Sequence, residues 1–221
     1  EINMKKRFLA LFLLTSGLMF LPGGLWTEAQ QTVPKATIIT AQLKYGIRIA
    51  VPSDWGLFNA EEVGALDRYV GKILDLSKYQ SVDSQLLIAA NYPPPPADTL
   101  AIMNVRYYGD LDVTETDLKS FSAQDVLEFD KGAKAMTIKG LEAGHMKLVA
   151  WLGTKKLELN GHPVLIVEYR RQLAADSPFH VQLAKFFPKS GAFTVTLSHK
   201  EGAGDFKQDD LKQILNSVQI K

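Results

Sequence analysis

Residues 147–173 read KLVAWLGTKKLEL, NG and HPVLIVEYRRQL, which is two apolar runs joined by an Asn-Gly pair. Asn-Gly between apolar runs favours a two-residue hairpin turn, because both residues readily adopt the positive φ that such a turn requires. We therefore predict an antiparallel hairpin in which Leu148–Leu159 pairs with Val164–Leu173.

A second hairpin is predicted directly downstream. Phe179–Phe187 and Ala192–His199 flank Pro188-Lys189-Ser190-Gly191, in which proline presets φ for a turn and glycine can close it in a left-handed conformation. The runs around both turns are rich in valine, isoleucine, phenylalanine and tyrosine, which pack well on a pleated surface. The stretch from Lys147 to His199 is therefore predicted to form a four-stranded antiparallel meander.

Upstream, apolar and polar residues alternate over Tyr45–Val51, which predicts a half-buried strand that Pro52 ends. Trp55 follows in a turn and is expected to fold back over the core, with a role as an exposed recognition aromatic as the alternative. Asn59 and Glu62 have the spacing of an N-cap and its N3 partner, so a helix is predicted from there to residue 75.

The remaining segments complete an alternating order of strands and helices. Strands are predicted at 86–90 and 100–108, joined by a stretch with four prolines at 93–96 that serves as a stiff connector or as a docking ligand. Thr114 and Asp117 predict a helix start, and the pattern slips near Ser122, as two helices meeting at an angle would do; 133–144 is left unassigned. A last helix, capped by Asp205, has an apolar face of Leu211, Ile214, Leu215 and Val218.

The N-terminus resembles a bacterial Sec-type secretory signal. Met4-Lys5-Lys6-Arg7 precedes the apolar run Phe8–Leu21, and small residues around Ala29 predict cleavage after that residue. An uncleaved anchor extending to Trp26 is the alternative. We thus expect a signal peptide at 1–29, a polar leader at 30–43, a single domain at 44–221, and a periplasmic or secreted location.

Composition narrows the function classes. The chain has no cysteine, which excludes disulfides, thiolate metal sites and cysteine nucleophiles. The predicted signal contains three of the 25 basic and two of the 24 acidic residues, so the remainder is close to neutral. A neutral chain without a block of basic residues is not expected to bind nucleic acid.

Residue patterns for catalysis or cofactor binding are sparse. The four histidines, His145, His162, His180 and His199, form no metalloprotease motif, and no Gly-x-Ser-x-Gly or phosphate-binding loop occurs. His180 and His199 could face each other across the second hairpin and hold a metal ion. The odd-numbered apolar residues of both strands instead predict a register in which these two histidines point to opposite sides. We therefore expect no catalytic residue, no cofactor and no metal site.

Three segments resemble PsbP-like domains. Tyr45–Trp55, YGIRIAVPSDW, is similar to their opening strand and Pro-x-x-Trp corner, Asn104–Tyr107 to a strand of their second hairpin, and Ile214–Val218 to their closing helix. The resemblance covers most of 45–221 and implies an α+β fold, an α/β/α sandwich with a mainly antiparallel sheet. That fold occurs in the extrinsic lumenal subunit of photosystem II, in a Ran-binding import factor and in many exported bacterial proteins, which mostly act by binding other proteins.

Two hypotheses on function follow. The first is an exported, non-catalytic protein-binding or assembly-accessory domain whose partner is another envelope protein, with membrane contact only if the N-terminal segment is retained. It predicts an apolar patch or groove on the surface. The alternative is an exported hydrolase that uses His145 or His162 near Glu142 or Glu158, and it predicts a pocket in which a histidine meets a carboxylate and a hydroxyl.

Overall fold

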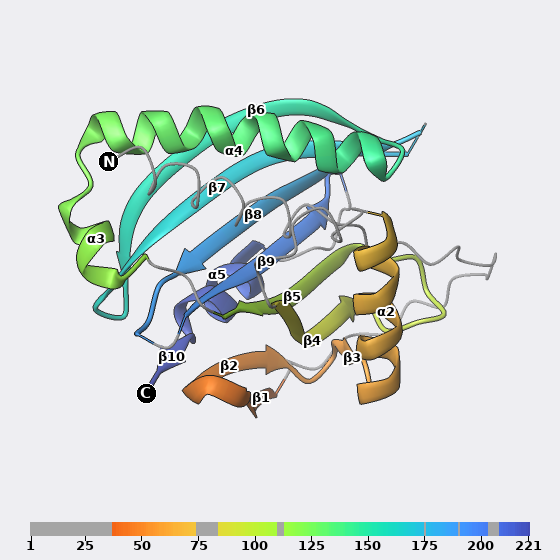
Figure 1. The fold of residues 1–221 in the computed structure, drawn as a ribbon. Coiled ribbons are helices and arrows are strands. Elements are labelled where there is room, and N and C mark those ends of the chain that lie inside the picture. Colours follow the sequence, from red (N-terminus) through yellow and green to blue (C-terminus); the bar gives the residue numbers. More distant parts are fainter. Residues whose placement is uncertain (1–36, 74–83, 110–112, 175, 190, 203–207) are drawn as a thin grey trace.

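The protein is an α/β/α sandwich built around a seven-stranded antiparallel sheet, seen in a computed structural model that describes residues 37–73, 84–109, 113–174, 176–189, 191–202 and 208–221 (Figure 1). The strand order in this sheet is β3-β4-β5-β9-β8-β7-β6. Its strands are β3 (Gly56–Leu57), β4 (Ser84–Tyr92), β5 (Ala101–Tyr108), β6 (Met146–Leu159), β7 (His162–Leu173), β8 (Phe179–Phe186) and β9 (Ala192–Lys200).

The predicted meander is confirmed as the β6-β7-β8-β9 half of this sheet. The β6–β7 turn has Asn160 at φ 52° and Gly161 at φ 82°, the left-handed pair that Asn-Gly favours. The β8–β9 loop ends on Gly191, which has a φ of 131° and whose N–H donates to the Pro188 carbonyl at 3.2 Å. Local turn chemistry therefore explains why consecutive strands pair here.

The two faces of the sheet carry separate cores. On β7, the odd-numbered residues Leu165 and Val167 join α3 and α4 in one core, and the even-numbered Val164 and Ile166 join β2 and α5 in another. The helices are α2 (Ala60–Ile73), α3 (Glu115–Ser120), α4 (Ala123–Ala143) and α5 (Gln208–Asn216). Because β7 is buried on both faces, it reads as an almost continuous apolar run.

Capping residues set where the helices begin. The Asn59 side chain accepts from the backbone of Glu61 and Glu62, and Thr114 and Ser122 each form a capping box with the residue three positions on. The predicted break near Ser122 is confirmed, since α3 ends at Ser120 and α4 begins at Ala123. α4 runs on to Ala143, so the segment left unassigned at 133–144 is helical.

A second, three-stranded sheet, β1-β2-β10, lies over the face that α5 also covers. It consists of β1 (Ile38–Gln42), β2 (Ile47–Pro52) and β10 (Gln219–Ile220), with the 3-10 turn η1 (Lys44–Gly46) between the first two. The predicted alternation holds from Ile47 onward, whereas Tyr45 lies outside the strand with φ 62° and stacks on Tyr107. The first described strand, β1, therefore lies inside the segment 30–43 that was predicted to be a polar leader.

Some predictions fall outside the described residues. These are the signal peptide at 1–29, the alternative anchor up to Trp26, and the cap at Asp205. Trp55 is buried against the core, as expected. None of the helices in the described ranges is long and apolar enough to cross a membrane.

Candidate functional site

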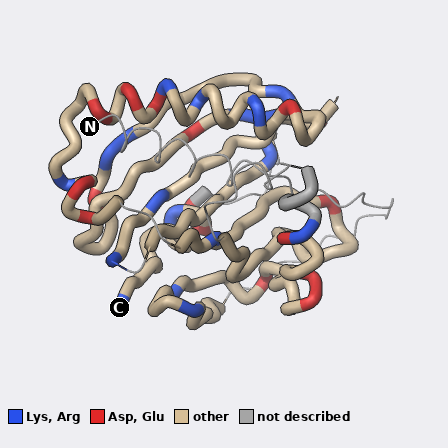
Figure 2. Tube along the Cα trace, viewed as in Figure 1, with Lys and Arg blue, Asp and Glu red and all other residues tan. Residues whose placement is uncertain are grey.

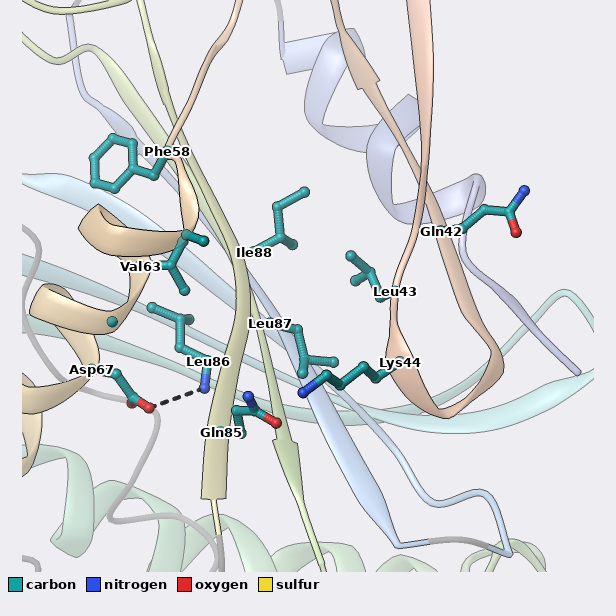
Figure 3. Close-up of a pocket in the computed structure, with 12 residues that line it drawn as sticks. Gln42, Leu43, Lys44, Phe58, Val63, Asp67, Gln85, Leu86, Leu87 and Ile88 are labelled. Atoms are coloured by element: carbon teal, nitrogen blue, oxygen red, sulfur yellow. Dashed lines mark hydrogen bonds between the residues drawn. The ribbon is translucent and has the colours of Figure 1, made fainter.

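A cleft of about 470 Å³ opens at the β4 edge of the large sheet (Figure 3). Its walls are helix α2 on one face of the sheet and the β1–β2 hairpin with its η1 turn on the other, and β4 forms the floor. It is lined by Gln42, Leu43, Lys44, Phe58, Ala60, Val63, Gly64, Asp67, Gln85, Leu86, Leu87 and Ile88. The volume is in the range of about 300–1,000 Å³ that is usual for binding sites.

The cleft lies between the core of the hairpin face and a third, smaller core under α2. Leu43 and Leu87 are partly buried against the core of the hairpin face, while Phe58 and Val63 are partly buried against the core under α2. All four side chains keep some exposed surface in the cleft. A partly exposed apolar lining of this kind is a feature of ligand and partner sites rather than of ordinary surface.

Asp67 is held at one wall of the cleft by Arg106. The carboxylate Oδ1 lies 2.6 Å from the Arg106 guanidinium, and Oδ2 accepts from the Leu86 N–H at 3.5 Å. Arg106 also donates to Ser84 and lies opposite Thr194 in the sheet. Because the Arg106 side chain is almost fully buried, its charge fixes the position of the Asp67 carboxylate.

Lys44 is the positive group of the cleft. Its side chain reaches from the hairpin across to β4, so that the amine points toward Gln85 (Figure 3). Among the described residues Lys44 has no acidic partner. By contrast, Figure 2 shows basic and acidic residues mixed along α4, the helix that covers the other end of the sheet. The cleft therefore combines an apolar lining with one uncompensated cation.

The prediction that His180 and His199 point to opposite sides is wrong. β8 and β9 pair these residues directly, and their ring centroids are 5.1 Å apart. The prediction assumed that the odd-numbered apolar residues of both strands share one core. Instead Leu183 belongs to the core under α4 and Val195 to the core on the opposite face. Since both strands are buried on both faces, the apolar pattern does not determine the register.

The histidine pair adjoins a charged group on β7. His180 Nε2 lies 3.7 Å from the Glu168 carboxylate, which is also 3.8 Å from the Lys155 amine, while Arg170 forms an ion pair with Glu201. Burial and the neighbouring His180 lower the pKa of His199. No group of three or more possible metal ligands is assembled within the described part of the chain. The cluster is thus a partly buried ion-pair network at the sheet surface.

Among the described residues, neither histidine of the hydrolase alternative forms an ion pair with a carboxylate expected for it. His162 Nδ1 lies 3.2 Å from Glu115, not Glu158, and His145 is an exposed residue at the end of α4 whose N–H donates to the Glu142 carbonyl. Hydrogen bonds from Lys119 and His162 lower the pKa of Glu115. Within the described ranges, no hydroxyl is hydrogen-bonded to His145 or His162.

One further titratable group lies inside the sheet. Lys185 on β8 is fully buried, with its amine 3.3 Å from the Thr194 hydroxyl and 5.7 Å from the centre of the Tyr108 ring. Burial lowers the pKa of Lys185 to about 7 and raises the pKa of Tyr108 above its ordinary value. Lys185 does not line the cleft, and its burial bears on the stability of the protein.

The sequence did not predict the position of the cleft. Its lining comes from three segments that are distant in sequence, and residues such as Leu87 and Val63 carry no motif. One indirect indication of the cleft was available from the sequence, because a binding domain is expected to have an apolar groove on its surface. Its position could be known only once β4 and α2 were placed.

The described residues thus define a two-layered core around an antiparallel sheet, with a cleft at one sheet edge. This arrangement is a PsbP-like fold. The chain is similar to cyanobacterial PsbP (CyanoP) from Synechocystis sp. PCC 6803, with a TM-score of 0.52 and 15% identity over 88% of this chain and 98% of that protein. The predicted fold class, α+β with an α/β/α sandwich, is confirmed.

Two other solved structures are similar at lower scores. LpqN of Mycobacterium tuberculosis, a protein involved in cell envelope biogenesis, has a TM-score of 0.43 and 11% identity over 79% of this chain and 83% of LpqN. A protein of Bacteroides thetaiotaomicron has a TM-score of 0.43 and 10% identity over 80% of this chain and 45% of that protein. No protein-family model and no curated protein matches the chain.

Proposed function

We propose that this protein is an exported, non-catalytic domain that binds another protein of the cell envelope through the cleft between α2 and the β1–β2 hairpin. The observation that carries the proposal is the cleft itself, in which partly exposed apolar side chains line the edge of the sheet together with Lys44, which has no acidic partner in the described part of the chain. The basic and apolar N-terminal sequence supports export. The PsbP-like fold is compatible with this role.

The hydrolase alternative has less support. It requires a histidine, a carboxylate and a hydroxyl that converge in a pocket. His162 on β7 and Glu115 on α3 form a pair that is not part of the cleft lining. The described residues that line the cleft include neither a histidine nor a hydroxyl side chain. A binding role therefore accounts for the geometry of the cleft better than a catalytic one.

Site-specific photocrosslinking tests the proposal. A photoreactive phenylalanine analogue at Phe58 places the probe in the cleft, and the same analogue at Leu152, an exposed apolar position on β6, serves as the matched control. In intact cells of the native host we expect one discrete crosslinked protein at Phe58 and none at Leu152. Identical products at both positions, or no product at Phe58, would contradict a binding role for the cleft.

A further inference from the structure

We infer that the partner presents an extended, apolar segment with an acidic residue, and that this segment adds to the free edge of β4 as a further strand of the large sheet. The inference rests on the proposed function and names the part of the partner that the cleft receives. It follows from three properties of the cleft, namely a stretch of β4 whose outer side pairs with no strand in the described part of the chain, an apolar lining on both sides and the cation of Lys44.

β3 is short and covers only one end of the outer edge of β4. β3 pairs with only two residues of β4, Ala90 and Asn91, and the Phe58 N–H then donates to the Ala89 carbonyl at 3.0 Å. At Asn59 the chain turns into α2 and leaves the sheet. Among the described residues, no strand pairs with residues 84–88 on the side away from β5. An incoming strand would continue the line that β3 begins.

The backbone groups of this edge point into the cleft. The Leu86 N–H donates to Asp67, and the Ala89 carbonyl accepts from Phe58, so both face away from β5. In a regular strand, backbone groups that face the same side are an even number of residues apart. The bulge between Leu86 and Ile88 changes this spacing, so that the two outward groups are three residues apart. Apart from the 3.5 Å contact to Asp67, which is at the long limit for a hydrogen bond, the Leu86 N–H is available to a peptide carbonyl.

The opposite edge of the sheet is built differently. β6 is 14 residues long and contains two bulges, between Leu148 and Ala150 and between Trp151 and Gly153. It also carries Lys147, Lys155 and Lys156. Lysines on an edge strand prevent pairing with another chain, and β4, which has a bulge of its own, carries no lysine. The protein therefore obstructs strand addition at β6, whereas at β4 it surrounds the free edge with a cleft.

The residues that line the cleft determine the length and the side chains of the partner segment that it can bind. Residues 84–88 span about 16 Å as a strand, enough to pair with an extended segment of about five residues. Such a strand alternates its side chains between the two faces, where Phe58 and Val63 lie on one side and Leu43 and Leu87 on the other. The partner segment should therefore carry apolar side chains on both of its faces. A carboxylate at the end nearest Gln85 would lie close to the Lys44 amine (Figure 3).

The test uses a phage-displayed library of random linear 12-residue peptides, selected on the full chain and counter-selected on Gly64→Trp. Gly64 lies on α2 and lines the cleft, and a Cβ there would contact only the end of the Arg68 side chain, at 3.5 Å. A Cβ at this position therefore meets no backbone atom outside α2, and tryptophan is chosen there to occupy the cleft. Leu127→Trp is the matched control, because it adds the same side chain at an exposed position of α4 that does not line the cleft.

Synthetic versions of the enriched peptides are then methylated at one backbone nitrogen at a time. We expect affinity to fall about tenfold or more at every second amide, because only alternate amides of a strand face β4. Lys44→Glu should weaken binding of acidic peptides, while Lys134→Glu and Leu127→Trp, both on α4 and outside the cleft, should leave it unchanged. Protection of the Leu86 amide from hydrogen exchange should rise when the peptide is bound.

Other outcomes separate this inference from the proposed function. If methylation is tolerated at every amide, or if no peptide is enriched while Phe58 still crosslinks to a discrete partner, strand addition is overturned and the binding function stands. A crosslink from Phe58 to a second copy of this chain would also overturn the inference. If the crosslink at Phe58 is absent as well, the proposed function fails together with the inference.

Discussion

The side-chain amide of Asn160 donates to the carbonyl of Val218 at 2.6 Å and to that of Asn216 at 2.9 Å. It therefore ties the β6–β7 turn to the end of α5 and the strand that follows. Asn160 has two functions at once, since its backbone adopts the positive φ of the turn and its side chain makes a contact between parts of the chain 58 residues apart.

Asn160→Asp tests the tertiary function of this residue. Aspartate tolerates the same backbone conformation, but its carboxylate would face two carbonyl oxygens that it cannot donate to. We expect the free energy of unfolding to fall by about 2 kcal/mol. Asn160→Gly removes the same hydrogen bonds without adding a charge and should cost less. Urea unfolding measures both, and an Asp variant as stable as the parent would show that the contact contributes nothing.

Lys185→Met should stabilise the protein at neutral pH. The buried amine has a pKa of about 7 in the folded state and an ordinary value of 10.5 when unfolded. The unfolded chain thus binds more protons between these values, so stability rises as the pH increases from 7 toward 10. Methionine removes this dependence and should raise the free energy of unfolding by a few kcal/mol at pH 7, since each pKa unit corresponds to about 1.4 kcal/mol.

Lys134→Met is the control for this change, because Lys134 is exposed on α4. It should leave both the stability and its slope between pH 7 and 9.5 unaltered. The measurement is guanidinium unfolding at four pH values over that range. If Lys185→Met and the parent have parallel stability curves, the amine is not held neutral by burial.

His199 should make the protein less stable in mild acid. Its folded-state pKa lies below 6.5 because of burial and the neighbouring His180, so the unfolded chain takes up a proton first as the pH falls. Stability contributed by the neutral ring is present above pH 6.5 and is lost as the pH falls through the folded-state pKa. In thermal unfolding from pH 7.5 to 5, His199→Gln should therefore lose less stability than the parent. An equal or larger loss in the variant would contradict the assignment.

Gly191 cannot carry a side chain without displacing its neighbours. A Cβ at this position would lie 2.4 Å from the Tyr108 carbonyl oxygen and 2.7 Å from the Tyr107 hydroxyl, and the residue has a φ of 131°. We expect Gly191→Ala to lower the free energy of unfolding by about 3 kcal/mol or more. Gly161→Ala, which has positive φ but open space around it, should cost only about 1–2 kcal/mol. Similar costs at both sites would show that the β8–β9 loop moves to make room.

The sequence alone determined the features that depend on a few neighbouring residues. Asn160 and Gly161 specify a left-handed turn, and Asn59, Thr114 and Ser122 specify helix starts, because each of these residues acts on backbone groups at most three positions away. The apolar runs of the meander followed from the same kind of reasoning, since strands joined by tight turns pair with each other. These signals were enough to predict the fold class.

Only the tertiary structure decided which faces those strands present and where the cleft lies. His180 and His199 share a face because the β8–β9 register pairs them directly. Both strands are buried on both sides, so hydrophobicity does not distinguish this register from the alternative. The cleft exists because β3 leaves the sheet after two residues while Lys44 and Val63 approach β4 from opposite sides. Such a site depends on distances between segments that no local pattern encodes, and it forms only when the layers are packed together.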